Sequence, residues 1–323
     1  PLLDAGYTVA RQQLPVTSWK APALALSNAS GALYDNDNSN RLKIYGDKFI
    51  IEFDKNTGLI CSYNVNGVNM LENGTAITPN FWRAMTDNDM GGDFANSFSQ
   101  WSNPALEQKE MNVRHDNDGS VLVSTTHHIS GTGATLTITY NIGGDGEILI
   151  GQHMTGADPN SLMPRFGITI TMPRDMDISH YYGRGPLENY IDRRSSEFIG
   201  LYTQTAAEQA YPYIRPQETG TKSDMRHWSQ TDAGGRGICI TSDAPFYAGA
   251  THYTVASLDE GKNKRNLHFQ EIDPIDATVL NIDGAHMGLG GITSWGGHSL
   301  PIEQYRLKSA DHEFRFKITP ASI

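Results

Sequence analysis

The chain has 323 residues, 38% of them hydrophobic, and a formal net charge of -11 with a pI near 5.4. This length exceeds one ordinary domain of roughly 100–200 residues, but it suits a large all-β domain with a small appendage and a sizeable core. The acidic balance, without any run of Lys or Arg, argues against nucleic acid as a partner.

Compartment is not assigned by the sequence. The two cysteines, Cys61 and Cys239, argue against a disulfide framework or a cysteine-based zinc site. No stretch approaches the roughly 18–20 apolar residues that span a bilayer, and the start lacks the regions of a signal peptide. Because the chain begins with Pro1, we expect a fragment of a longer or processed polypeptide.

The first 40 residues differ in composition from the rest. Residues 1–20 contain one strand-like run, Tyr7–Val16, which alone would bury almost nothing. Residues 21–40 are rich in Pro, Ala, Ser, Asn, Asp and Gly, which is typical of a linker or long turn. The main domain is therefore predicted at residues 41–323.

From residue 41 onward, alternation of apolar and polar residues predicts strands. Leu42 and Ile44 alternate with polar neighbours, and so do Phe49, Ile51 and Phe53. Turn sequences such as Asn-Gly and Gly-Asp-Gly separate the runs. Further strands are predicted at Leu59–Tyr63, Val68–Leu71, Val121–Ile129, Thr135–Ile142, Glu147–Ile150, Phe166–Met172, Gly237–Thr241, Thr278–Ile282 and Phe314–Ile318.

Helical patterns are scarce. Only Gln204–Ala210 and Ala256–Gly261 have one, each a turn or two long. No repeat at a period of 20–50 residues indicates a propeller or solenoid. The sequence predicts an all-β fold, a large antiparallel β-sandwich with few short helices and long functional connections.

The connection Asn80–Asp93 has a calcium-loop appearance because it holds three acids within seven residues. An EF-hand needs a bidentate acid at its twelfth position, which is Phe98 here. We therefore expect these acids to make turn hydrogen bonds, with the preceding Phe81 and Trp82 buried.

Two later connections combine charge with turn residues. In Gly183–Arg193, Glu188 and Asp192 lie four residues apart and could serve glycoside chemistry, which uses paired carboxylates about 5–10 Å apart. The neighbouring arginines favour a structural ion-pair network instead. The segment Tyr211–Gly220, with proline-stiffened aromatic residues, is typical of a loop that faces an interface.

The segment Leu280–Trp295 starts like a strand and then becomes rich in glycine, at positions 284, 288, 290 and 291. Glycine allows positive φ angles and close backbone approach, so the pattern predicts a shaped loop that presents the indole of Trp295. No histidine spacing typical of a metal site, nucleophile elbow, phosphate loop or dinucleotide fingerprint is present.

These four segments, in this order and spacing, resemble the C-terminal domain of the large bacterial β-galactosidases of glycoside hydrolase family 2, the Escherichia-type lactases. The resemblance covers residues 41–323 and rests on Arg83 with Asp87-Asn88-Asp89, on the runs 183–193 and 216–220, and on residues 283–295. Residues 1–20 are similar to the end of the immunoglobulin-like domain that precedes it.

The resemblance implies a supersandwich like that of galactose mutarotase, in contact with a (β/α)₈ barrel and the immunoglobulin-like domain. Both glutamates of the retaining mechanism, and the main ligands of a divalent cation, Mg or Ca, belong to the barrel. The chain by itself would then hold no catalytic residue, no metal and no cofactor, and would be inactive. Its parent would cleave terminal β-D-galactosyl bonds, as in lactose, in the cytoplasm or periplasm of a bacterium and away from membranes.

Two substrate-binding positions follow from the resemblance. Trp295 matches the tryptophan that this domain lends to the mouth of the sugar pocket, where an indole stacks on the apolar face of a galactoside. Gly91 matches the start of a loop near that pocket. Residues Gly91–Asn96 depart from the Escherichia-type pattern, which puts a role in closing over substrate in question.

Two other functions remain open at this stage. An aldose 1-epimerase needs a carboxylate base and a histidine acid across a sugar-sized cleft. A stand-alone carbohydrate-binding module would use exposed tryptophans, Trp295 and Trp228, as platforms. Candidates for the epimerase pair are His286, His227, Glu218 and Glu188.

Overall fold

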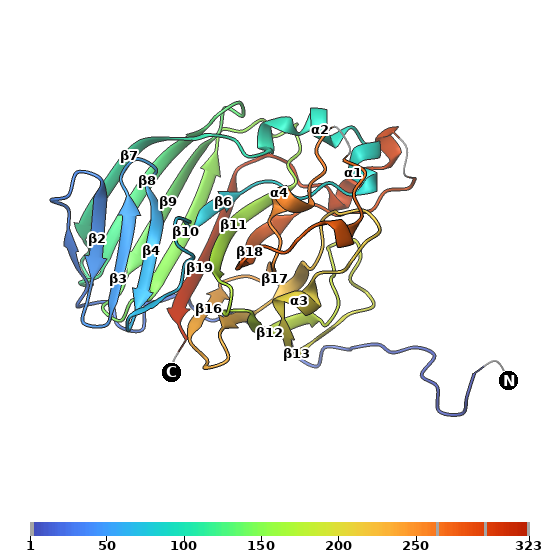
Figure 1. Cartoon of the computed structure of the whole chain (residues 1–323), viewed down its shortest axis with the longest axis horizontal. Helices are drawn as coiled ribbons and strands as arrows, with labels where there is room; N and C mark the ends of the chain where they lie inside the picture. Colours follow the sequence, from blue (N-terminus) through green and yellow to red (C-terminus); the bar gives the residue numbers. More distant parts are fainter. Residues whose placement is uncertain (1–2, 263–264, 294–295, 322–323) are drawn as a thin grey trace.

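The computed structural model describes residues 3–262, 265–293 and 296–321 (Figure 1). Antiparallel strands make up three sheets, and the four α-helices within these residues have only four or five residues each. The all-β, antiparallel prediction is therefore confirmed. The α-helices are α1 Asp87–Gly91, α2 Phe94–Ser97, α3 Ala206–Gln209 and α4 Val255–Leu258, and the 3-10 turns are η1 Ser99–Trp101, η2 Phe269–Glu271, η3 Gly296–His298 and η4 Glu303–Tyr305.

The first sheet is a five-stranded meander in the order β1-β2-β3-β4-β5. Its inward positions alternate as predicted, with Phe49, Ile51 and Phe53 buried in one strand. Phe53 meets Tyr140 of the large sheet edge to face, with ring centroids 5.0 Å apart. The strands are β1 Leu33–Asp35, β2 Arg41–Tyr45, β3 Phe49–Asp54, β4 Leu59–Val65 and β5 Val68–Asn69.

The nine-stranded sheet has the order β13-β12-β15-β16-β19-β10-β9-β8-β7, and its strands β7, β8 and β9 lie behind the first sheet in Figure 1. In β8 every second residue is buried, which places His127 inside and turns His128 to the other face, as predicted. The strands are β7 Leu106–His115, β8 Val121–Ile129, β9 Thr135–Ile142, β10 Ile148–Thr155, β12 Ile178–Gly185, β13 Phe198–Thr205, β15 His227–Thr231, β16 Gly237–Ser242 and β19 His312–Pro320.

The second five-stranded sheet, in the order β14-β17-β18-β11-β6, carries the residues of the candidate site. Its β18 begins within one residue of the prediction but continues through Gly284 to His286, so the glycine-rich segment starts as a strand. The partner β11 has a register irregularity at Phe166/Gly167, opposite this extension. The strands are β6 Thr78–Asn80, β11 Arg165–Pro173, β14 Lys222–Met225, β17 Phe246–Thr251 and β18 Ala277–His286.

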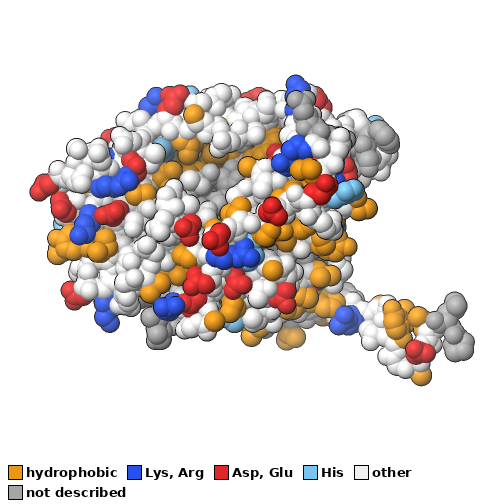
Figure 2. All heavy atoms as spheres, in the orientation of Figure 1, with side chains coloured by type: hydrophobic (Ala, Val, Ile, Leu, Met, Phe, Trp, Pro, Cys, Tyr) orange, Lys and Arg blue, Asp and Glu red, His pale blue; other side chains and the backbone are white. Residues whose placement is uncertain are grey.

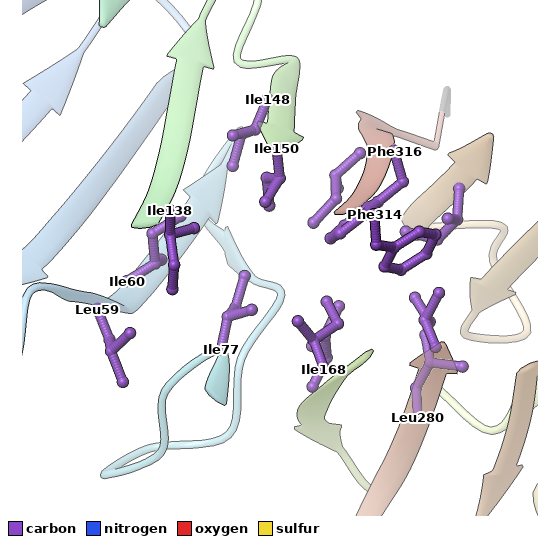
Figure 3. Close-up of a cluster of buried hydrophobic side chains, with 14 of the residues drawn as sticks. Leu59, Ile60, Ile77, Ile138, Ile148, Ile150, Ile168, Leu280, Phe314 and Phe316 are labelled. Carbon is purple, nitrogen blue, oxygen red and sulfur yellow. The ribbon is translucent and has the colours of Figure 1, made fainter. Parts of the chain in front are cut away.

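An apolar core fills the space between the sheets (Figure 3). Ile168 and Leu280 of the second small sheet point toward Phe314 and Phe316 of β19 in the large sheet. All four side chains are at most 5% exposed, and the two phenyl rings stack with centroids 4.8 Å apart. Burial of about 1.5–3 kcal/mol per large apolar side chain makes this layer the main stabilising element.

The N-terminal segment departs from the prediction. No strand forms over residues 7–16, and Val9, Leu14 and Val16 are exposed, because no strand of the described chain pairs with them. The side-chain amide of Gln13 makes the pair of hydrogen bonds that a neighbouring strand would make: it donates to the Ile199 carbonyl and accepts from the Ile199 N–H, both over 2.8 Å.

The segment predicted as a linker is attached to the sandwich over part of its length. Ser27 donates through its backbone N–H and its hydroxyl to the carboxylate of Glu147, over 2.6 and 2.9 Å. Strand β1 then pairs with β2. The boundaries 1–20, 21–40 and 41–323 stay predictions.

Acidic and basic side chains are interspersed over the face shown in Figure 2. Among the described residues, no helix combines the length and apolar character that crossing a membrane requires. Cys61 and Cys239 are both free thiols.

Candidate functional site

A pocket of about 390 Å³ lies where the four segments singled out from the sequence converge. Each segment contributes to its wall, although they are as much as two hundred residues apart along the chain. The volume falls within the range of roughly 300–1,000 Å³ that small-molecule sites occupy. The lining residues are Thr86, Asp87, Asn88, Asp192, Arg193, Tyr213, Gln217, Glu218, Leu289 and Gly290.

The first wall is the start of α1, a helix that the alternation pattern did not predict. Thr86 caps it, and Asp89 returns the interaction by accepting from the Thr86 backbone N–H over 3.0 Å. The spacing Thr-x-x-Asp is a capping box, a signal present in the sequence. Asp89 also receives the Arg83 guanidinium at 3.0 and 2.7 Å, so this acid serves the fold, as the turn hypothesis predicted.

The second wall is the backbone of the glycine-rich segment after β18. Arg83 donates to the carbonyls of Met287 and Gly288, over 2.6 and 3.0 Å. Asn88 donates to the carbonyl of Leu289 over 3.2 Å. This loop is therefore held by side chains of the first wall, which are 201 to 205 residues away in sequence.

Beyond Leu289 the loop turns back on itself. The N–H groups of Ile292 and Thr293 both approach the carbonyl of His298, at 2.8 and 3.2 Å. A side chain at Gly291 would come within 2.2 Å of the Ser299 carbonyl oxygen, so glycine is needed for this close approach. The predicted substrate residue Trp295 lies outside the described residues.

Gly91 is the last residue of α1, next to the glycine-rich loop. A side chain at the adjacent Gly92 would meet Leu300 at 2.8 Å, so the end of α1 lies against the residues that follow the loop. The prediction of a loop over residues 91–96 is wrong in part. Helix α2 begins at Phe94, and the ring of Phe94 is completely buried. A role of Gly91 in substrate binding stays a prediction.

Next to the third wall, which Asp192 and Arg193 form, lies Glu188, one of the two acids considered for glycoside chemistry. Its carboxylate pairs with Arg193 and accepts from the hydroxyl of Tyr213. It also accepts from Thr219 Oγ1 at 3.1 Å and the Gly220 N–H at 2.9 Å. These donors join the third wall to the fourth, residues 211–220, and confirm the structural ion-pair hypothesis.

A buried polar cluster lies beneath the pocket. Arg165, which is fully buried, lies 3.3 Å from a Glu218 oxygen and 3.1 Å from an Asp283 oxygen. The Asp283 carboxylate has no hydrogen-bond partner within the described residues, so its contact with Arg165 is an ion pair only. Burial raises the pKa of Asp283 to about 7. The negative charge of Glu218, which shares the same guanidinium, acts in the same direction.

His286 completes this cluster in a neutral form. Its Nε2 lies 3.8 Å from Glu218, and its Nδ1 lies 2.8 Å from the Met287 carbonyl. Burial and the positive charges of Arg165 and Arg83 hold the pKa of His286 well below its usual range. Sequence reasoning missed Arg165, since a lone arginine before a predicted strand gives no signal of what it will meet.

The geometry contradicts the epimerase pair of His286 and Glu218. An epimerase needs its acid and base on opposite sides of a sugar, whereas these two groups are buried 3.8 Å apart with no room for a sugar between them. Glu188 is occupied by its four donors. The proposed platform Trp228 is also wrong, because it is fully buried and stacks on Tyr181 at 4.9 Å.

Across the part of the chain that the structure describes, no group of three or more His, Cys, Asp or Glu side chains is arranged to hold a metal ion.

Comparison with known proteins gives a consistent result. The family model described as "Beta galactosidase small chain" matches residues 45–318. A β-galactosidase of Priestia megaterium is 33% identical over 317 residues, which cover 97% of this chain and 30% of that protein. One from Lactobacillus delbrueckii subsp. bulgaricus is 31% identical over 301 residues, covering 92% of this chain and 28% of that protein.

The chain thus spans about 30% of the length of these relatives. Among solved structures, a galactose 1-epimerase from Lactobacillus acidophilus aligns with a TM-score of 0.45 at 8% identity, covering 92% of this chain and 100% of that one.

Proposed function

Since the chain belongs to the β-galactosidase small chain family, we propose that it is the part of a β-galactosidase that completes the sugar pocket without supplying the catalytic groups. The complete enzyme hydrolyses terminal β-D-galactosyl bonds in lactose-like substrates. One observation carries the proposal. Four distant segments meet at one pocket, and their side chains hold the backbone of the loop that leads to Trp295.

In this proposal the chemistry belongs to the remainder of the enzyme. Two glutamates of a (β/α)₈ barrel act as nucleophile and acid/base with retention of configuration, and a divalent cation has its main ligands there. The acids near the pocket support this division of labour. Glu188 and Asp89 are both held by buried or backbone donors, so neither is free to attack a sugar or protonate a leaving group.

The chain contributes binding. A galactoside has an apolar face of C–H groups, and an indole stacked on it contributes dispersion and burial while hydroxyl groups are bound elsewhere. We place Trp295 in this role, at the end of a loop whose base is fixed. The rim residues Tyr213 and Asp87 belong to the surface that meets the barrel domain.

The test combines the purified chain with the catalytic portion of its enzyme and measures cleavage of a chromogenic β-galactoside. Trp295→Ala is expected to lower kcat/KM by about 10-fold or more, equivalent to roughly 1.4 kcal/mol. Trp19→Ala is the matched control, because Trp19 packs on Arg226 beside a different pocket. Equal activity of both variants would remove Trp295 from the site.

A further inference from the structure

Several hydrogen bonds hold the glycine-rich loop before its closed end, and two of the side chains that make them are charged: Arg83 and Asp192. We propose that Asp192 and Arg83 are positioning residues that clamp residues 287–290 and so set the place of the substrate-facing loop. This inference rests on the proposed function for its effect on substrate, but the clamp itself is a property of the chain.

Arg83 provides the inner point of the clamp. It is fully buried, and its planar guanidinium addresses two successive carbonyls, those of Met287 and Gly288. The adjacent edge of the same guanidinium, Nε and Nη2, donates to both oxygens of Asp89. Since Asp89 also closes the capping box of α1, one rigid group couples the helix to the loop.

Asp192 provides the outer point of the clamp from the pocket wall. Its Oδ2 accepts the backbone N–H of Gly290 over 2.7 Å, a charge-assisted hydrogen bond. The carboxylate also lies under Gly288, where a side chain would approach Asp192 Cγ to 2.7 Å. Glycine at 288 therefore lets the backbone descend onto the carboxylate.

The turn that presents Asp192 is itself fixed. Tyr190 and Arg193 exchange backbone hydrogen bonds of 3.1 and 2.8 Å across it, and the Tyr190 side chain is fully buried. The second oxygen, Oδ1, is buried and has no hydrogen-bond partner in the described chain. One carboxylate oxygen thus binds the loop and the other is buried. This arrangement suits a positioning residue better than an acid that reacts.

The clamp predicts different outcomes for two substitutions at one position. Asp192→Ala removes the acceptor, whereas Asp192→Asn keeps an oxygen in place and loses only the charge. Hydrogen exchange of the 287–293 segment in the purified chain is expected to accelerate about 10-fold or more in the first variant and less in the second. Asp243→Ala, at an exposed ion pair with Arg315, is the matched control and leaves this exchange unchanged.

The second measurement uses the same variants in the active enzyme. A positioning role raises KM for the galactoside about 10-fold in Asp192→Ala, with kcat changed less, and Asp192→Asn recovers most of the affinity. Circular dichroism confirms that each variant is folded. Unchanged exchange in Asp192→Ala overturns the clamp. Faster exchange with unchanged KM overturns the positioning role, and if Trp295→Ala is also silent, the proposed function fails as well.

Discussion

Two regions of the molecule are equally buried but differ in the side chains that fill them. Around Phe316, the layer between the sheets consists mainly of apolar side chains that pack against one another (Figure 3), and the buried Gln152 opposite Phe314 carries no charge. Beneath the pocket, Arg165 holds two carboxylates, and several of the polar atoms there have no hydrogen-bond partner among the described residues. A buried ion pair of this kind contributes little net stability compared with apolar packing.

The contrast shows that the charged cluster fixes the positions of side chains, although it contributes less to stability than the apolar layer does. The apolar layer specifies that the sheets pack together, whereas the charged cluster specifies how residues 218, 283 and 286 lie relative to the loop. It connects the floor of the pocket, through Glu218, to the end of β18, from which the loop departs. The following substitutions test this contrast, from the largest expected effect to the smallest.

Phe316→Ala is expected to lower the free energy of unfolding by about 3–5 kcal/mol, because it leaves a cavity in a fully buried layer. The loss is the same between about pH 6 and 9, since no charge is nearby to titrate. Urea denaturation followed by fluorescence measures it. A loss that varied by more than about 1 kcal/mol over this range would contradict the description of the layer as uncharged.

Arg165→Met is expected to cost about 3 kcal/mol near pH 8, because it leaves the carboxylates of Glu218 and Asp283 buried without a counter-ion. The cost falls toward pH 5, because the raised pKa of Asp283 lets this carboxyl group become protonated. Arg114→Met, in an exposed pair with Asp116, is the control and changes stability by about 1 kcal/mol or less. A cost independent of pH would show that the guanidinium acts through packing alone.

The third effect, at Lys222, is the smallest when it is measured over a single pH unit. Lys222 is buried beside Gln209 and Gly220, and burial lowers the pKa of Lys222 to about 7. The unfolded chain then binds more protons than the folded chain above about pH 7, so stability rises with pH toward about 9.5, by up to roughly 1.4 kcal/mol per unit. Below about pH 7 this contribution is constant.

Lys222→Met removes that slope, which urea titrations at several pH values would detect as a difference from the parent chain. Lys48→Met, at an exposed surface position, keeps the slope and serves as the control. If the parent and the Lys222→Met chain show the same pH dependence, Lys222 is not buried with a lowered pKa.

Much of the fold was predictable from local pattern. The alternation in residues 121–129 and 135–142 predicted β8 and β9 with their inward faces, and the two weak helical patterns coincide with α3 and α4. The strand expected at 7–16 did not form, because alternation alone supplies no partner. Helices α1 and α2 were missed, because the connection that holds them was interpreted from its turn residues and the capping-box spacing of Thr86 and Asp89 was not used.

The candidate site was predictable as segments but not as contacts. The sequence separately indicated Asn80–Asp93, Gly183–Arg193, Tyr211–Gly220 and Leu280–Trp295, and the structure brings all four to one pocket. It did not indicate that Arg165 lies beneath them. Nor did it show that Trp228 would be enclosed, since an indole suits a core and a sugar platform equally.

By itself, the sequence determined the all-β class, the buried faces of most strands and the unusual character of four connections. Each of these depends on residues within about ten positions of one another, where side-chain period and turn chemistry act directly. Only the tertiary structure decided that Asp192 would bind the N–H of Gly290 and Arg83 the carbonyl of Met287. Those pairs are 98 and 204 residues apart, and what brings them together is sheet register and packing rather than local propensity.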